Sequence, residues 1–262
     1  MLAIPTLDVR MKLNGKVAIV TGAGRGIGKA TASALAKEGA NITVTDIDVP
    51  AIQQLAKELQ SMGRESLPVK ADVTKFNEIK QMVDLTVEKF GRVDILCNIA
   101  GILSGASHPQ ILNITEEDWD RTLDINLKGV FFCSKAVFKP MMNQRSGKII
   151  NIASSAGDFA ALGGTVHYAA SKGGVIAFTK TLAIEGAPYG ITVNAVSPSY
   201  IDTDLLKGMS DQTKQSIIRH TLLGRLGKPE EVAEAVVFLA SNANYSTGTV
   251  IQVQGGLMMR LP

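Results

Sequence analysis

A glycine-rich turn near the amino terminus constrains the fold of this 262-residue chain more than any other stretch. The turn runs from Thr21 to Gly28, follows the apolar run Lys16–Val20 and leads into a helical pattern at 26–38. Glycines let a backbone turn tightly, and the free N–H groups at the start of a helix attract an anion. A purely structural turn is the alternative. The strand–turn–helix context favours a site for a dinucleotide pyrophosphate, held by Gly22, Arg25, Gly26, Ile27 and Gly28.

Strand-like and helical segments alternate along the rest of the chain. The strand-like runs are nearly continuous in Val, Ile, Leu and Ala, which is typical of strands covered on both faces of a parallel sheet. They lie at 41–45, 65–70, 93–97, 148–153, 191–196 and 249–253, and the helical patterns at 50–62, 75–90, 115–143 with a break near Gly129, 168–187, 202–222 and 229–240. We therefore expect an α/β fold. It is a single-domain, doubly wound Rossmann-type parallel sheet of about seven strands, in the order 3-2-1-4-5-6-7, with helices on both faces.

Composition and charge exclude several classes of function. Lysine and arginine total 27 against 24 acidic residues, without a basic block, so no nucleic-acid partner is expected. We also expect no membrane span, no signal peptide and a cytoplasmic location, with Cys97 and Cys133 as buried free thiols. The three histidines lie far apart, so no metal site is expected. Residues 1–10 are predicted to be a flexible extension of one domain at 11–262.

Asp46 ends the second predicted strand, 18 positions beyond Gly28. A carboxylate there can accept hydrogen bonds from the ribose hydroxyls of adenosine and repels a 2′-phosphate, which favours NAD over NADP. Arg25 is a signal in the opposite direction, because a cation in the glycine-rich turn can reach a 2′-phosphate. We give Asp46 more weight, since its charge must be neutralised before NADP fits well. A solvated acid at a strand end is the alternative.

Tyr168 and Lys172 stand four positions apart at the start of a helical pattern. On a helix, positions i and i+4 share a face, with Cβ atoms roughly 5–6 Å apart. A lysine ammonium at that distance favours the ionised phenol, so Lys172 is expected to lower the pKa of Tyr168. Such a tyrosine serves as a general acid–base. Taken alone, the pair is better explained as two unrelated polar residues on an exposed helical turn, and the rest of the chain is what favours the catalytic interpretation.

Together these motifs resemble the short-chain dehydrogenase/reductase family over nearly the whole chain, from about Leu13 to Gly256. The resemblance implies a catalytic tetrad of Asn126, Ser154, Tyr168 and Lys172, in which Tyr168 exchanges the proton, Ser154 binds the reacting oxygen, Lys172 also holds the nicotinamide ribose and Asn126 holds a water. It also implies dinucleotide contacts by Asp72 and Val73 at the adenine, by the loop of Asn98, Ala100 and Gly101, by Tyr168 and Lys172, and by Pro198, Ile201 and Thr203.

The assignment of the catalytic serine has two candidates, Ser154 and Ser155. Consecutive residues of a strand point to opposite faces, so only one of them can face the site. The S-x-x-G pattern at the strand end selects Ser154, whereas counting thirteen positions back from Tyr168 selects Ser155. We favour Ser154, because an inserted loop residue is absorbed more easily than a register slip of the strand. Ser154→Ala is expected to remove most activity, and Ser155→Ala is not.

Three variable regions are expected to bind the substrate: 102–113, 155–167 and a flap at 199–222. Their side chains include Leu103, His108, Phe159, Leu162, His167, Tyr200, Leu205, Leu206 and Met209, and we expect both histidines to be loop or surface residues. The main hypothesis is NAD-dependent interconversion of a small secondary alcohol, with polyols and sugars included, and a ketone. The first alternative is reduction of a 3-oxoacyl thioester, and the second is a non-catalytic dinucleotide-sensing regulator. The family resemblance implies a homotetramer built through the helices at 115–143 and 168–187.

Overall fold

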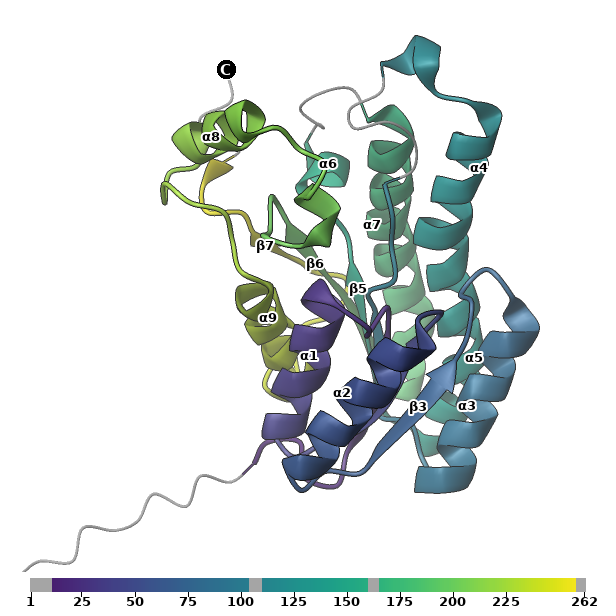
Figure 1. Ribbon diagram of the computed structural model, residues 1–262. Coiled ribbons are helices and arrows are strands. Elements are labelled where there is room, and N and C mark those ends of the chain that lie inside the picture. Colours follow the sequence, from purple (N-terminus) through teal and green to yellow (C-terminus); the bar gives the residue numbers. More distant parts are fainter. Residues whose placement is uncertain (1–10, 104–109, 160–164, 258–262) are drawn as a thin grey trace, which may run out of the picture.

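The computed structural model describes residues 11–103, 110–159 and 165–257, and the predicted extension at 1–10 lies outside them. A seven-stranded parallel sheet forms the centre of the molecule, in the order β3-β2-β1-β4-β5-β6-β7 (Figure 1). The predicted fold class and strand order are confirmed. The strands are β1 Val17–Thr21, β2 Asn41–Asp46, β3 Ser66–Lys70, β4 Ile95–Asn98, β5 Gly147–Ile152, β6 Ile191–Pro198 and β7 Val250–Val253.

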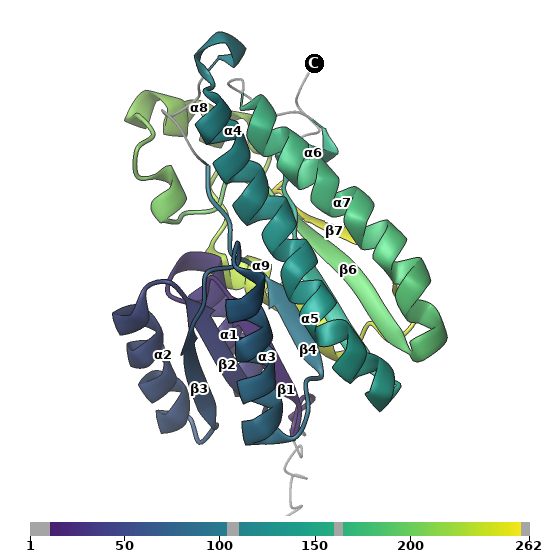
Figure 2. The ribbon, with the colours of Figure 1, turned by 90° about the vertical axis from the view of Figure 1, so that its right-hand side faces the viewer.

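Helices cover both faces of this sheet. On one face lie α1 (Gly26–Lys37), α2 (Val49–Ser61) and α9 (Pro229–Ser241), and on the other lie α3 (Phe76–Phe90), α5 (Gly129–Gln144) and α7 (Val166–Gly186) (Figure 2). Each layer has its own apolar core, because the central strands bury side chains on both sides. Among the described residues, no helix combines the length and the apolar character needed to cross a membrane.

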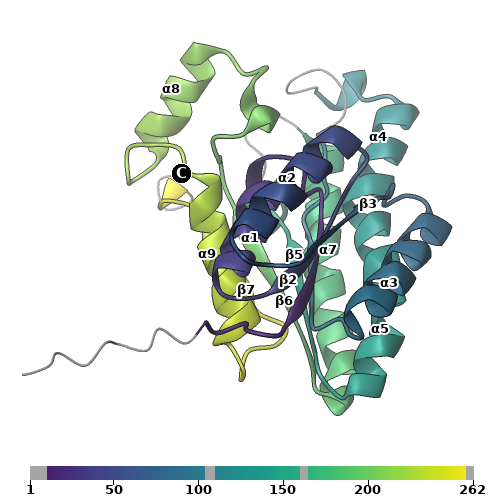
Figure 3. The same cartoon turned by 60° about the horizontal axis from the view of Figure 1, so that its bottom comes forward.

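The strand order changes direction between β1 and β4. The chain moves outward from β1 to β2 and β3, returns to β4, and then moves outward in the other direction through β5, β6 and β7. The loops after β1 and β4 therefore diverge at the carboxyl ends of the strands. Open parallel sheets bind their ligands in the crevice that such a switch point creates. Figure 3 shows the same sheet with its lower end brought forward.

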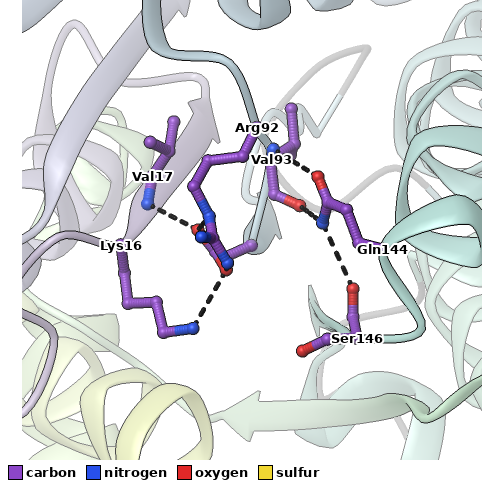
Figure 4. A network of polar contacts seen from close by, with 7 residues as sticks. Lys16, Val17, Arg92, Val93, Gln144 and Ser146 are labelled. Atoms are coloured by element: carbon purple, nitrogen blue, oxygen red, sulfur yellow. Dashed lines mark hydrogen bonds and ion pairs between the residues drawn. The ribbon is translucent and has the colours of Figure 1, made fainter.

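A charged network closes the opposite, amino-terminal edge of the sheet, next to the starts of β1 and β4 (Figure 4). Asp94 is 4% exposed and accepts hydrogen bonds from Arg92 Nε (2.7 Å) and Nη2 (2.6 Å), Lys16 Nζ (3.1 Å) and Val17 N (3.0 Å). Burial acts to raise the pKa of Asp94, but the hydrogen bonds from Arg92, Val17 and Lys16 outweigh it, so the pKa lies below its ordinary value. The network stabilises this edge.

Three segments differ in detail from the sequence-based prediction. The helix expected at 115–143 consists of α4 (Glu116–Leu123), a π-helical turn at Asp124–Lys128 and α5, so the irregular turn directly precedes Gly129. A Cβ on Gly129 would lie 2.8 Å from Val73 Cγ2, which explains the glycine. The segment 202–222 forms a 3₁₀ turn at Asp204–Leu206 and α8 (Asp211–His220), separated because the Ser210 side chain caps α8 by accepting from Thr213 N. A one-turn helix, α6 (Ser155–Asp158), was not predicted.

Candidate active site

The glycine-rich turn places the start of α1 at the crevice between the loops after β1 and β4. Gly22 and Gly26 have φ values of 63° and 52°, a region that favours glycine. A Cβ on Gly28 would lie 1.9 Å from Gly22 O, and a Cβ on Gly22 would lie 2.8 Å from Ala100 Cα. No side chain caps the start of α1 at Arg25, so its free N–H groups are available to an anion. This backbone fits the pyrophosphate of a dinucleotide.

Asp46 faces the same turn from the end of β2. Its carboxylate accepts hydrogen bonds from Gly24 N (3.0 Å) and Asp48 N (3.1 Å). A half-buried carboxylate is thereby fixed beside the turn, 18 positions beyond Gly28 along the chain. The Arg25 side chain is 77% exposed and forms an ion pair with Asp204 at 3.8 Å. The Asp46 carboxylate is therefore fixed to the turn by a hydrogen bond from its backbone, whereas the charged group of Arg25 is not.

The flap after β6 lies over the glycine-rich turn. Ser199 N donates to Val253 O (3.1 Å), and Ile201 pairs with Gly227 in an isolated parallel bridge. Pro198 is buried at the end of β6, opposite Val253. Thr203 then reaches the turn, because its Cγ2 lies 3.3 Å from the position of a Cβ on Gly26. Of the dinucleotide contacts predicted on this flap, Thr203 therefore lies next to the glycine-rich turn, and Ile201 lies two residues before it.

Other predicted dinucleotide contacts have side chains that the structure uses elsewhere. The Asn98 side chain turns into the interior, where Nδ2 donates to Asn151 Oδ1 (2.8 Å) and Ser134 Oγ (3.2 Å). Val73 packs in the core against α5, and Asp72 Oδ1 accepts from the backbone and hydroxyl of Thr74. The Asp72 N–H is also used, because it donates to Glu78 Oε2 (2.9 Å), whereas no hydrogen bond engages the second carboxylate oxygen of Asp72 among the described residues. The loop after Asn98 is held by Thr21 Oγ1, which accepts from Ile99 N and Ala100 N.

Tyr168, Ser154 and Lys172 meet at the carboxyl end of β5. Ser154 is the N-cap of α6, where its Oγ accepts from Ala156 N (3.2 Å), and it also hydrogen-bonds Tyr168. Lys172 is 4% exposed, and its Nζ donates to Ile152 O (2.7 Å) and lies 5.9 Å from the centre of the Tyr168 ring. Ser155 is instead a buried residue inside α6.

The pKa of Tyr168 differs from the sequence-based expectation. Burial raises it, the hydrogen bond with Ser154 partly lowers it, and the neighbouring Tyr200 phenol raises it further, so the net shift is upward. The predicted lowering by Lys172 is not found, because the causes that set the pKa of Tyr168 are burial, Ser154 and Tyr200. Burial lowers the pKa of Lys172 itself to about 8. With its pKa above the ordinary value, the Tyr168 phenol is protonated near neutral pH, so its oxygen carries a proton that could be transferred.

Asn126 lies within the π-helical turn at Asp124–Lys128, a kind of turn that is frequent at functional sites. The side chain is fully buried. Its Oδ1 accepts from Ile102 N (2.8 Å), and its Nδ2 donates to Ile102 O (2.9 Å) and Ser171 Oγ (3.1 Å). A Cβ on Gly101 would lie 3.3 Å from Asn126 Oδ1 and 3.5 Å from Lys172 Nζ, so the loop after Asn98 packs directly against these two members of the predicted tetrad.

Sequence reasoning missed two parts of this arrangement. Ser171 links Asn126 to the Tyr168 backbone by donating to Tyr168 O (2.7 Å), a link that the i, i+3 spacing could have indicated. His167 is fully buried on α7, so its assignment to a loop or surface is wrong. Its position next to Tyr168 at a helix start gave no local signal of burial. His108 and Leu162, predicted near the substrate, lie outside the described residues.

The chain belongs to the short-chain dehydrogenase/reductase family. A family model described as "Enoyl-(Acyl carrier protein) reductase" matches residues 22–258. Two relatives are named 3-oxoacyl-[acyl-carrier-protein] reductase: one from Thermotoga maritima, 42% identical over 95% of this chain and all of the relative, and one from Synechocystis sp., 44% identical over 94% and 98%. The crystal structure of a short-chain type dehydrogenase/reductase from Mycobacterium marinum superposes with a TM-score of 0.89 at 36% identity, covering 95% of this chain and 97% of that one. Family membership implies a nicotinamide dinucleotide cofactor.

Proposed function

We propose that this chain reduces the keto group of a 3-oxoacyl thioester to a secondary alcohol. The observation that carries the proposal is the hydrogen-bonded pair of Ser154 and protonated Tyr168, with Lys172 buried beside the tyrosine ring. The names of the two relatives support the thioester as the substrate class. Reduction of a ketone needs a proton donor at the carbonyl oxygen, and the protonated Tyr168 phenol beside Ser154 can supply that proton.

Each side chain has a distinct part in the proposed chemistry. Tyr168 donates its proton to the carbonyl oxygen. Ser154 already accepts from Ala156 N, so its hydroxyl hydrogen can be donated to the same oxygen as negative charge develops there. Lys172 has N–H groups beyond the one given to Ile152 O, and these would hold the nicotinamide ribose. The bound dinucleotide supplies the hydride, and the glycine-rich turn with the start of α1 holds its pyrophosphate.

NAD(H) is the dinucleotide that this proposal favours. Asp46 is anchored to the turn by Gly24 N, whereas Arg25 is exposed and paired with Asp204. The same observation favours a second candidate, the NAD-dependent oxidation of a small secondary alcohol, including a polyol or sugar. A carboxylate at this position repels a 2′-phosphate in either case.

Nicotinamide absorbance, followed with a 3-oxoacyl thioester, a panel of ketones and secondary alcohols and both dinucleotides, tests the proposal. We expect thioester reduction with NADH to have the highest kcat/KM, Ser154→Ala to lose most of it and Ser155→Ala to keep it. Turnover restricted to polyols or other alcohols would select the second candidate. Dinucleotide binding without turnover on any substrate would contradict both and favour the regulator hypothesis.

The proposal includes a homotetramer in the cytoplasm. Phe131 on α5 and Trp119 on α4 are 42% and 40% exposed, and Ile184 on α7 is 76% exposed, so the two helix surfaces assigned to assembly carry uncovered apolar groups. Light scattering coupled to size exclusion tests the assembly, and a monomer would contradict it. Cys97 and Cys133 are buried free thiols, which is compatible with a reducing compartment.

A further inference from the structure

The one-turn helix α6 carries Ser154 at its start, yet a helix of four residues has too few hydrogen bonds to hold its own position. Its internal contacts are Gly157 N to Ser154 O (2.9 Å), Asp158 N to Ser154 O (3.3 Å) and Phe159 N to Ser155 O (3.0 Å). Catalytic geometry is sensitive to small displacements. Contacts with the rest of the fold must therefore fix the place of Ser154 relative to Tyr168.

One such contact is the close approach of α6 to α7. A Cβ on Gly157 would lie 2.5 Å from Gly173 N and 2.5 Å from Lys172 C, distances that real Cβ atoms do not reach. The backbone of α6 thus rests directly on α7, one residue beyond Lys172. This contact sets the depth of α6 against α7, but a glycine face without side chains does not stop the turn from sliding or rotating.

A second contact ties the other end of α6 to the sheet. The hydroxyl of Ser197 donates a hydrogen bond to Asp158 Oδ2. Ser197 is fully buried in β6, where it pairs with Gln252 of β7, so its hydroxyl is a fixed point. Asp158 is half-buried and is the last residue of α6. A hydrogen bond to a charged acceptor is among the stronger ones in proteins.

We propose that Asp158 and Ser197 are positioning residues, whose hydrogen bond holds α6 against rotation and so keeps Ser154 Oγ at the Tyr168 phenol. The inference rests on the carbonyl reduction proposed above and adds a residue pair outside the tetrad. Neither residue touches the reacting atoms in this assignment: both act through Ser154. Gly157 sets the distance from α7, and the Asp158–Ser197 bond sets the orientation.

The first test compares Asp158→Ala, Asp158→Asn and Ser197→Ala. Loss of the bond is expected to lower kcat about 10- to 100-fold. The KM for the dinucleotide should stay within about twofold, because the glycine-rich turn lies on other elements. Asp158→Asn should restore kcat to within a few-fold of wild type, since its amide oxygen accepts the same hydrogen bond. Asp84→Ala, which removes an exposed acid paired with Lys80 on α3, is the matched control and should leave kcat unchanged.

Action through Ser154 has its own test. In a Ser154→Ala background, Asp158→Ala should add no further loss of kcat, because the group it positions is already absent. An equal multiplicative loss in both backgrounds would overturn the proposal, as would an Asp158→Asn enzyme as slow as Asp158→Ala or an Asp158→Ala enzyme with wild-type kcat.

A readout independent of turnover separates this inference from the proposed function. The N–H groups of Ala156 and Gly157 bond to Ser154, so their amide hydrogen exchange reports on the order of α6. Exchange should accelerate in Asp158→Ala and Ser197→Ala but not in Asp158→Asn or Asp84→Ala. If wild type shows no turnover, the proposed function fails, but the exchange rates still test whether Asp158 and Ser197 hold α6 in place. Unchanged exchange in Asp158→Ala would overturn the positioning role.

Discussion

The two edges of the sheet use buried polar groups in opposite ways. At the amino-terminal edge, Asp94 accepts four hydrogen bonds from three residues. Two of these residues, Arg92 and Lys16, carry the positive charges that balance the Asp94 carboxylate. At the carboxyl edge, burial dominates: it raises the pKa of Tyr168 and lowers the pKa of Lys172, which forms no ion pair with a carboxylate among the described residues. The first edge holds its charge in a hydrogen-bonded network, whereas at the second edge burial sets the pKa values of the titratable groups.

This contrast follows from the direction of the strands. In a parallel sheet with a switch point, the loops at the carboxyl ends diverge and leave a crevice in which a ligand can bind. At the amino-terminal edge, Asp94 instead pairs with Arg92 and Lys16 of the protein itself. The substitutions below should separate stability at one edge from activity at the other.

Tyr168→Phe should have the largest effect, and on activity alone. Removing the proton donor is expected to lower kcat about 10²–10⁴-fold, because general acid catalysis contributes about that much. Thermal unfolding should remain near that of wild type, since the ring and its packing are retained. Steady-state rates and a melting curve check this. A Tyr168→Phe enzyme that keeps its activity would show that a group other than Tyr168 donates the proton.

Asp94→Ala should show the reverse pattern at the other edge. Its loss leaves Val17 N buried without its acceptor, and we expect the free energy of unfolding to fall by about 2–3 kcal/mol. The loss is smaller than for a fully buried pair because Arg92 and Lys16 side chains reach solvent. Chemical denaturation measures the change. A fall in kcat per folded molecule as large as that of Tyr168→Phe would show that the two edges are not separate.

The sequence predicted the features that depend on local spacing and missed those that depend on tertiary packing. The glycine-rich turn and the i, i+4 pair of Tyr168 and Lys172 follow from short patterns. The strand order follows from the alternation of strands and helices that is typical of a doubly wound sheet. The inward turn of Asn98 could not be predicted, because alternation carries no information in a strand buried on both faces. The pKa direction at Tyr168 needs the extent of burial, and the Asp158–Ser197 contact joins residues 39 positions apart.

The buried lysine predicts a pH dependence of stability. Burial lowers the pKa of Lys172 in the folded protein to about 8, below its ordinary value of 10.5. Between these two pH values the unfolded chain binds a proton that the folded chain has released, so unfolding becomes less favourable as pH rises. The free energy of unfolding of wild type minus that of Lys172→Met should therefore increase between about pH 8 and pH 10. Denaturation curves of both proteins measure it. A difference that stays flat, or decreases, would mean that Lys172 keeps its charge on folding.

Asp46→Asn should change activity the least of these substitutions. It tests which dinucleotide binds at the carboxyl edge of the sheet. The amide oxygen can still accept from Gly24 N, so the turn should keep its shape and kcat/KM with NADH should stay within a few-fold. Removing the negative charge should raise kcat/KM with NADPH about tenfold, the size expected for one partly solvated repulsion. Arg25 then becomes the nearer charge for a 2′-phosphate, once it leaves its weak pair with Asp204. Matched rates with both dinucleotides check this, and an unchanged NADPH rate would show that Asp46 does not set the preference.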